Sequence, residues 1–307
     1  MRRHALWTLV AIVAVELGLV GAGGAYYVLS QTGGVHGPAV IASFYPYQFL
    51  ASRVAGDRFA VTALVPPGVE PHDWEPTPRD VLTIGTAAAF VYNGYVEAYL
   101  PNLLKDLPPD QPLRVDASAG LPVILGGEGG ANAVDPHLWL DPVRVETSVA
   151  TIAASFSRVD PSGAAVFQAN AAKLRQDLAR IDGLFAAGLQ TCDRRVFITQ
   201  HEAFAYLAAR YNLTQVAIQG LSPDQEPTPA KVQEILHVIN ATGSKVVFFE
   251  ELVNPAVAQT LANEAHVQTM VLSPIEGLTA EERANGDTYL SLMEMNLQNL
   301  RIALECA

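Results

Sequence analysis

Eight short apolar segments, rich in β-branched and aromatic residues, alternate along the chain with segments of helical periodicity. These predicted strands lie at 40–44, 59–65, 90–92, 113–115, 195–199, 216–218, 245–249 and 268–272. Such alternation is typical of α/β folds with mostly parallel strands. Because each half of the chain contains four of these segments, we predict two similar lobes.

A long helical pattern begins after Asp160-Pro161 and separates the two halves, with no proline before Cys192. Its apolar residues fall on one stripe: Phe167, Leu174, Leu178, Ile181 and Phe185. A helix of about 25 residues would be roughly 37 Å long, which is the length of a whole lobe. We therefore predict a first lobe at 38–160, one linking helix at 161–190 and a second lobe at 191–307.

The tetrapeptide Glu-Pro-Thr-Pro occurs twice, at 75–78 and at 226–229, each time ahead of a predicted helix. In this order Thr is suited to cap a helix N-terminus and the second Pro to occupy the first helical position. One shared tetrapeptide is weak evidence for duplicated lobes by itself.

Residues 5–29 are almost continuously apolar and follow the basic pair Arg2-Arg3. The run of about 25 residues exceeds a cleavable signal core of about 7–15 residues and is long enough to span a bilayer. We predict that residues 1–30 form an uncleaved membrane anchor, which leaves the rest of the chain in the periplasm or on the outer face of the membrane. Cleavage near Gly23-Gly24-Ala25 is the alternative.

Cys192 and Cys306 are the only cysteines. In an oxidising compartment they are predicted to pair as a disulfide, with two free thiols as the alternative. The formal net charge of −12 and the lack of long basic runs argue against nucleic acid as a partner. An acidic chain is better suited to a cationic ligand, although acidity also simply favours solubility.

Three histidines, His72, His137 and His201, each follow a predicted strand or a loop closely. In open α/β sheets ligands bind beyond the carboxyl ends of the strands, so these side chains could converge on one crevice. Pro71 and Pro136 restrict the backbone directly before two of them. However, their wide spacing matches no local zinc motif, and a single histidine is more often a structural residue. The residues alone leave both roles open.

Five longer segments resemble the zinc/manganese solute-binding family of ABC importers, the ZnuA-like and TroA-like receptors. They are VPPGVEPHDWEPTP at 65–78, DPHLWLDP at 135–142, HEAFAY at 201–206, SPDQEPTP at 222–229 and LSPIEGLT at 272–279. The resemblance extends in order from about Val40 to the C-terminus. It implies two Rossmann-like lobes with parallel sheets, joined by a single long helix and holding a metal ion between them.

The resemblance also implies four ligands: His72, His137, His201 and Glu276. The fourth is assigned because the segment 272–279 is similar to the zinc-receptor branch, which has Glu at this place. Other branches have an Asp nearby, where this chain has Ser273 and Pro274, so the fourth ligand is either Glu276 or water. Three imidazoles and one carboxylate suit Zn²⁺, whereas Mn²⁺ prefers more oxygen ligands.

Several other side chains are expected near the metal. The candidates to accept the second ring N–H of a ligand histidine are Asp73, Asp135, Asp141 and Glu202. Trp74, Trp139 and Tyr206 are expected to pack around the site. Glu250 and Glu251 follow a strand directly, and we expect them in an exposed loop; a contact with a ligand histidine or with the permease is the alternative.

The predicted function is that of a monomeric receptor, not an enzyme, which captures Zn²⁺ outside the cytoplasm. It would deliver the ion to a separate ABC permease and ATPase, since the chain has no Walker motif. The alternatives are a Mn²⁺ receptor of the same family, a surface adhesin, and a zinc-dependent hydrolase. The hydrolase would require Glu276 to be free and water to occupy the fourth position.

Overall fold

The computed structural model describes residues 37–125, 133–223 and 226–307, and Gly37–Ala307 form one compact unit. The predicted anchor at 1–30 lies outside the described residues and stays a prediction. Within the part that is described, no helix is long and apolar enough to cross a membrane.

The first lobe contains a parallel sheet of four strands in the order β2-β1-β3-β4. The strands are β1 (Ala39–Ala42), β2 (Ala60–Ala63), β3 (Ala89–Tyr92) and β4 (Leu113–Asp116). The helices between them are α2 (Tyr45–Ala55), α3 (Pro78–Gly85) and α4 (Leu100–Asp106).

The second lobe repeats this arrangement, with a parallel sheet in the order β6-β5-β7-β8. Its strands are β5 (Val196–Thr199), β6 (Thr214–Ala217), β7 (Val246–Phe249) and β8 (Gln268–Val271). Its helices are α7 (Ala205–Arg210), α8 (Pro229–Thr242) and α9 (Ala256–Ala265). All eight predicted strand segments overlap observed strands, and the prediction of two lobes with parallel sheets is confirmed.

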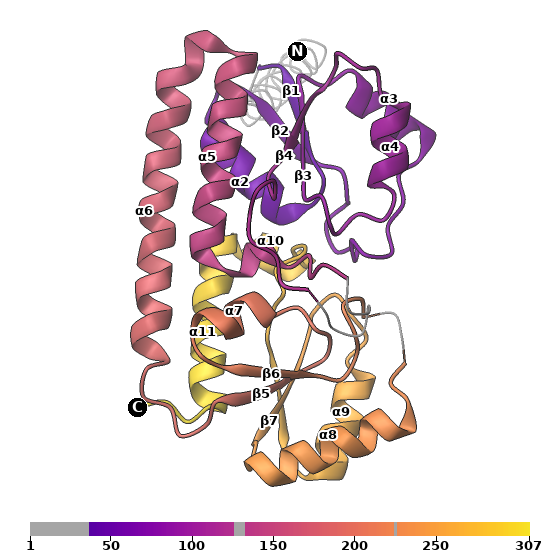
Figure 1. Cartoon of the computed structure of the whole chain (residues 1–307), viewed down its shortest axis with the longest axis vertical. Helices are drawn as coiled ribbons and strands as arrows, with labels where there is room; N and C mark the ends of the chain where they lie inside the picture. Colours follow the sequence, from indigo (N-terminus) through magenta and orange to yellow (C-terminus); the bar gives the residue numbers. More distant parts are fainter. Residues whose placement is uncertain (1–36, 126–132, 224–225) are drawn as a thin grey trace, which may run out of the picture. The chain divides into compact units, whose positions relative to one another are not determined.

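The long helix α6 (Ala164–Gly188) leads from the first lobe to the second (Figure 1). It packs against α2, against α5 (Pro142–Val159) and against α11 (Tyr289–Ala303), and the predicted apolar stripe is buried along it. Two 3₁₀ helices, η1 (Leu138–Leu140) and η2 (Pro161–Gly163), precede α5 and α6, and α10 (Ala280–Asn285) precedes α11. The single long helix expected from the resemblance is therefore present.

The two Glu-Pro-Thr-Pro segments start equivalent helices in the two lobes. The side chain of Thr77 accepts a hydrogen bond from the backbone N–H of Asp80 at the start of α3, and Thr228 accepts one from Lys231 at the start of α8. In both helices the proline after the capping threonine occupies the first turn, where its missing N–H removes no intrahelical bond.

One large hydrophobic core includes residues of both lobes and of α6. Val40 and Val91 contribute from the first sheet, Phe197 and Phe248 from the second, and Leu178 from α6. Two smaller, separate cores lie beneath α3 and α4 in the first lobe and beneath α8 and α9 in the second. The shared core holds the carboxyl ends of the two sheets in a fixed relation.

Cys192 and Cys306 form a disulfide, as predicted. Next to it, the backbone N–H of Ala307 donates to the carbonyl of Thr191 at 2.9 Å. These contacts attach the end of α11 and the C-terminus to the segment that leads into β5.

Candidate metal centre

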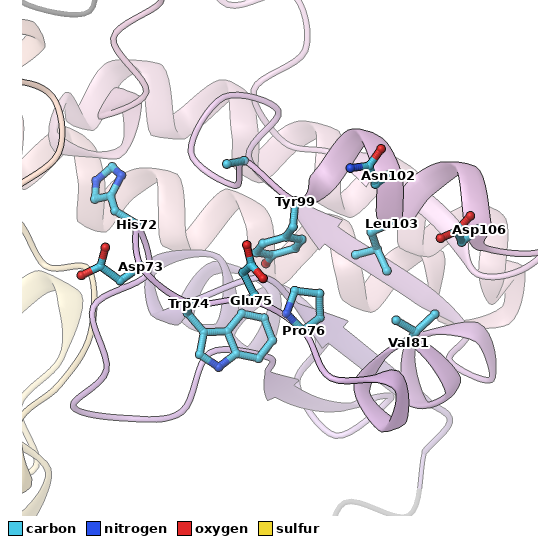
Figure 2. A pocket seen from close by; sticks show the side chains of 11 residues that line it. His72, Asp73, Trp74, Glu75, Pro76, Val81, Tyr99, Asn102, Leu103 and Asp106 are labelled. Carbon is cyan, nitrogen blue, oxygen red and sulfur yellow. The ribbon is translucent and has the colours of Figure 1, made fainter. Parts of the chain in front are cut away.

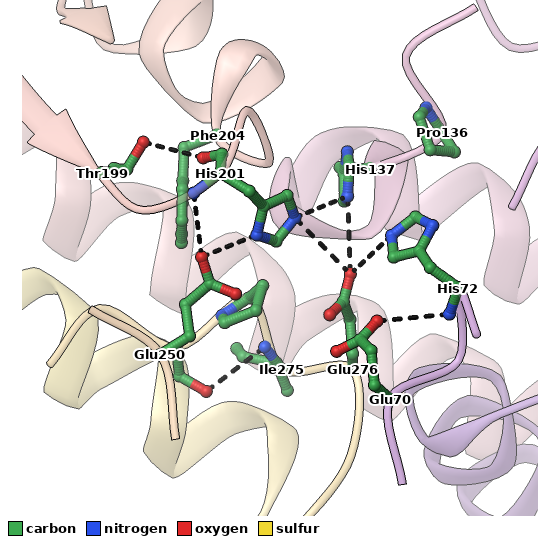
Figure 3. A network of polar contacts seen from close by, with 12 residues as sticks. Glu70, His72, Pro136, His137, Thr199, His201, Phe204, Glu250, Ile275 and Glu276 are labelled. Carbon is green, nitrogen blue, oxygen red and sulfur yellow. Dashed lines mark hydrogen bonds and ion pairs between the residues drawn. The ribbon is translucent and has the colours of Figure 1, made fainter. Parts of the chain in front are cut away.

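Loops that follow four different strands bring the four predicted ligand residues together (Figure 3). His72 follows β2 and His137 follows β4 in the first lobe, while His201 follows β5 and Glu276 follows β8 in the second. One candidate ligand atom from each residue lies within 4.8 Å of the others. The carboxyl ends of both sheets thus contribute two side chains each to one centre.

The donor atoms have the separations that one zinc ion would require. Glu276 Oε1 lies 3.2, 3.4 and 3.9 Å from the Nε2 atoms of His72, His137 and His201. The Nε2 atoms of His137 and His201 are 3.2 Å apart. Zn–ligand distances of about 2.0–2.1 Å in a tetrahedral site place neighbouring donors roughly 3.3 Å apart. The geometry and the mixed nitrogen and oxygen donor set both fit zinc.

The centre is almost fully shielded from solvent. The side chains of His137, His201 and Glu276 are 0% exposed, and that of His72 is 8% exposed. Unpaired polar groups at this depth are costly. A cation bound by all four would satisfy the inward-facing donor atoms.

Carboxylates hold two of the histidines in position. Asp135 Oδ1 lies 2.9 Å from the Nδ1 of His137 and accepts from the backbone N–H of the same residue at 2.9 Å. Glu250 Oε1 contacts Nδ1 of His201 at 2.6 Å and accepts from its backbone N–H at 3.1 Å. When Nδ1 donates to a carboxylate, Nε2 carries the lone pair that a metal needs.

The expectation that Glu250 lies in an exposed loop was wrong. Its side chain is 2% exposed, because Glu250 is the first residue after the central strand β7 and β7 pairs with β5, which leads to His201. Glu251 is partly buried, and burial raises the pKa of its carboxyl to about 7.

Of the acids predicted to support the ligands, Asp135 has that role, whereas Asp141 is structural. Asp141 accepts a hydrogen bond from the backbone N–H of Val143 at the start of α5 and pairs with Arg144 and Arg210.

Sequence reasoning missed Asn93, the first residue after β3. Its buried side-chain amide donates to the carbonyl of Pro136 at 2.8 Å and so fixes the backbone directly before His137. Asn93 and Glu250 occupy equivalent places after the equivalent strands β3 and β7. For Asn93 the position directly after a central strand was the only available signal, since an asparagine does not by itself point to a metal site.

The electrostatics favour a negatively charged Glu276. Burial acts to raise its pKa, but hydrogen bonds with His137 and His72 outweigh this effect and hold the pKa well below its usual value. Burial acts to lower the pKa of His137, but hydrogen bonds to Asp135 and Glu276 raise it to about 9. Without metal, the protonated imidazole of His137 therefore stabilises the Glu276 carboxylate.

Glu70 adds a fourth, partly buried carboxyl group beside the centre. Burial and the neighbouring charge of Glu276 raise its pKa to about 10, so it is protonated at neutral pH. Its Oε1 accepts from the backbone N–H of His72 at 3.2 Å. Glu70 thus fixes the backbone at His72 without adding a second negative charge.

Two of the predicted aromatic residues connect the lobes at the site. The ring of Trp139 lies 5.1 Å from that of His137, and its indole N–H donates to the carbonyl of Pro274 at 2.7 Å. The hydroxyl of Tyr206 donates to the carbonyl of Asp135 at 2.7 Å. Trp74 lies farther out and packs against Tyr99.

A cavity of about 550 Å³ opens beside His72 (Figure 2). Its lining includes Trp74 and Tyr99, together with the carboxylates of Asp73, Glu75 and Asp106. His72 is the only one of the four predicted ligands that lines it. The cavity therefore approaches the centre from the His72 side.

A family model described as ZnuA, zinc-uptake complex component A, periplasmic, matches residues 40–303. This chain belongs to the ZnuA family. The match covers both lobes, the long helix and all four predicted ligand residues.

Among its ZnuA-family relatives, the high-affinity zinc uptake system protein ZnuA of Bacillus subtilis is 37% identical over 277 residues, which are 86% of this chain and 87% of that protein. The zinc-binding lipoprotein AdcA of Streptococcus pneumoniae is 38% identical over 274 residues. That match covers 85% of this chain and 55% of AdcA, so this chain spans about half the length of AdcA.

Solved structures of ZnuA-like proteins have the same fold. The Zn(II)-bound ZnuA-like domain of Streptococcus pneumoniae AdcA superposes with a TM-score of 0.78 at 38% identity, over 88% of this chain and 99% of the domain. The laminin-binding protein Lmb of Streptococcus agalactiae, described as having adhesin and metal-transporting activity, gives a TM-score of 0.78 at 30% identity. That match covers 87% of this chain and 100% of Lmb.

Proposed function

We propose that this chain is the extracytoplasmic solute-binding component of an ABC importer, with Zn²⁺ as its cargo. The ion would be held by His72, His137, His201 and Glu276 and passed to a separate membrane permease driven by an ATPase. The observation that carries the proposal is the convergence of these four buried donors between two lobes of ZnuA-family topology.

Zinc is favoured over manganese by the donor set. Three imidazole nitrogens and one carboxylate form a four-coordinate set of borderline softness, whereas Mn²⁺ prefers more oxygens and a higher coordination number. Cu²⁺ and Ni²⁺ would also bind such a set in vitro, because affinity for nitrogen ligands rises along the first-row metals.

A receptor is favoured over a hydrolase by the position of Glu276. Catalytic zinc sites have three protein ligands and keep a fourth position for water, whereas structural sites are closed by four protein ligands. Here the Glu276 carboxylate points into the space between the three Nε2 atoms. With Glu276 as a ligand, no position is left to activate water.

We extend the proposal to the organisation of the chain. Residues 38–160 and 191–307 form the two lobes, 161–190 connect them, and 1–30 anchor a monomeric receptor at the membrane. Adhesion is a second candidate function, favoured by the laminin-binding proteins among the structural neighbours.

The first experiment measures zinc affinity of the purified protein by competition with a chromophoric chelator, and metal content by native mass spectrometry. Glu276→Ala is compared with Glu294→Ala. The control removes a carboxylate of α11 that pairs with Arg180 of α6 and is not one of the four predicted ligands. We expect one tightly bound zinc in the wild type and in Glu294→Ala, and at least tenfold weaker binding in Glu276→Ala. Equal affinities in all three proteins would exclude Glu276 as a ligand and reopen the water-bearing alternative.

A further inference from the structure

Each lobe has a surface groove at the same place in its fold. In the first lobe, the cavity of about 550 Å³ lies between the segment that enters α3 and the helix α4. In the second lobe, a cavity of about 290 Å³ lies between the segment that enters α8 and the helix α9. The helices α3 and α8 are equivalent in the repeated topology, as are α4 and α9.

The residues that line the two grooves correspond position by position. Six of the eight pairs are Glu75 with Glu226, Pro76 with Pro227, Val81 with Val232, Asn102 with Thr260, Leu103 with Leu261, and Asp106 with Glu264. The first three pairs come from the Glu-Pro-Thr-Pro segments and the first turn of the helix that follows. The last three have the same spacing along α4 and α9.

Both grooves combine buried leucines with acidic residues in their lining. The leucines are Leu103 and Leu261. The four carboxylates that correspond between the grooves are exposed: Glu75, Asp106, Glu226 and Glu264. Among the described residues, none of the four takes part in a salt bridge, and no lysine or arginine lines either groove.

The grooves lie on the same side of the unit Gly37–Ala307. Figure 1 shows α3 and α4 above α8 and α9, on the side opposite α5 and α6. The two helix pairs rest on the two small separate cores, whereas α6 packs into the large shared core. A single partner could therefore contact both grooves without disturbing the long helix.

We propose that the two grooves dock the permease, each receiving a basic side chain of one permease subunit beside its exposed carboxylates. This inference rests on the proposed function, and it adds the surface through which the zinc would be delivered. Two equivalent grooves on one chain fit a partner that presents two equivalent surfaces, as subunits related by a two-fold axis do. Unpaired carboxylates complement basic side chains and increase the rate of encounter.

The first groove also extends to His72, whereas the second reaches none of the four predicted ligands. A basic side chain bound in the first groove would lie on the exposed side of the metal centre. Positive charge there lowers the affinity for a cation, which would couple docking to release.

The test measures uptake of radioactive zinc by cells of the source organism that carry the full chain with Glu75→Ala, Glu226→Ala or both substitutions. The control is Glu146→Ala with Glu294→Ala, which removes two partly exposed carboxylates, paired with Arg175 and Arg180, from α5 and α11 on the opposite side. We expect about threefold slower uptake for each single substitution and at least tenfold slower uptake for the double, because paired contacts reinforce each other. The control should match the wild type.

Zinc affinity of each purified variant separates this inference from the proposed function. We expect affinities within twofold of the wild type, since none of these carboxylates belongs to the four predicted ligands. Uptake by the double variant at the control rate would overturn the docking proposal and leave the receptor proposal intact. A wild-type chain that supports no zinc uptake would overturn both.

Photo-crosslinking provides a second readout that needs no loss of function. A photoreactive amino acid replaces Asn102 or Thr260 in the full chain, with Lys173 on α6 as the control position. We expect both groove positions, but not the control, to crosslink to the permease identified by mass spectrometry. Permease crosslinks from Lys173 alone, or from none of the three positions, would contradict the proposal.

Discussion

The two lobes share one topology but contribute their histidines from different strands. His201 lies two residues after Thr199, which ends the central strand β5, and its side chain is fully buried. His72 follows the edge strand β2 after a longer loop and is 8% exposed. His137 and Glu276, by contrast, follow the equivalent strands β4 and β8. The edge strand alone does not make His72 accessible, because His137 and Glu276 also follow edge strands and are fully buried; His72 differs in lining an open cavity.

The largest effect should follow from removal of a fully buried ligand. His137→Ala and His201→Ala should each weaken zinc binding on the order of a hundredfold or more, because even loss of a group that only supports a ligand costs about 10–100-fold. Chelator competition measures the affinity, and thermal melting without metal checks the fold. An affinity within threefold of the wild type in a folded variant would refute the assigned ligand set.

The next largest effect is expected for the Glu250 carboxylate, which contacts Nδ1 of His201. Glu250→Gln should weaken zinc binding about 10–100-fold, because an amide cannot fix the His201 tautomer as a carboxylate does. Asn93→Ala, at the equivalent place in the first lobe, should cost less than tenfold, since Asn93 contacts the backbone of Pro136 and not an imidazole. Similar losses in both variants would contradict this difference between the lobes.

His72→Ala should have a smaller effect on affinity, about tenfold, and act mainly on the rate of zinc release. His72 is the one predicted ligand that lines an open cavity, so the other three would still enclose the ion. Stopped-flow release into excess chelator measures the rate. A release rate from His72→Ala that equals the wild-type rate would show that the ion leaves by another side.

Glu97→Gln is expected to leave zinc affinity unchanged and to alter only the pH dependence of stability. Burial raises the pKa of Glu97 from its ordinary value of 4.5 to about 8, whereas the equivalent residue of the second lobe is the neutral Asn254. Between pH 4.5 and about 8 the folded state therefore binds more protons at Glu97 than the unfolded state does. The contribution of Glu97 to the free energy of unfolding is greatest below this range and falls as pH rises through it. From pH 6 to pH 7 the wild type should lose about 1.4 kcal/mol relative to the variant.

Urea unfolding of both proteins at pH 6 and pH 7 measures this difference, and zinc affinity provides the control. A pH dependence identical in the two proteins would mean that Glu97 is ionised in the folded state over this range.

The sequence predicted the strands and the long helix because each depends on local apolar patterns, such as the stripe from Phe167 to Phe185. His72, His137, His201 and Glu276 were proposed only through the family resemblance, and the structure brings them together. The role of Asn93 could not be predicted, and support of a ligand by Glu250 was only an alternative, because both roles depend on which strands pair. Glu250 meets His201 across 49 residues of sequence only because β7 lies beside β5.

The hydrophobic core that continues from one sheet through α6 to the other has an evolutionary consequence. Lobes that share no core can be recombined between relatives as independent modules. In a chimera of two relatives joined within α6, apolar side chains of this helix from one parent would pack against a lobe from the other parent. Mismatched side-chain volumes in a packed interior cost stability. We infer that the two lobes of such receptors diverge together, and that functional chimeras will be rarer than their similar topologies suggest.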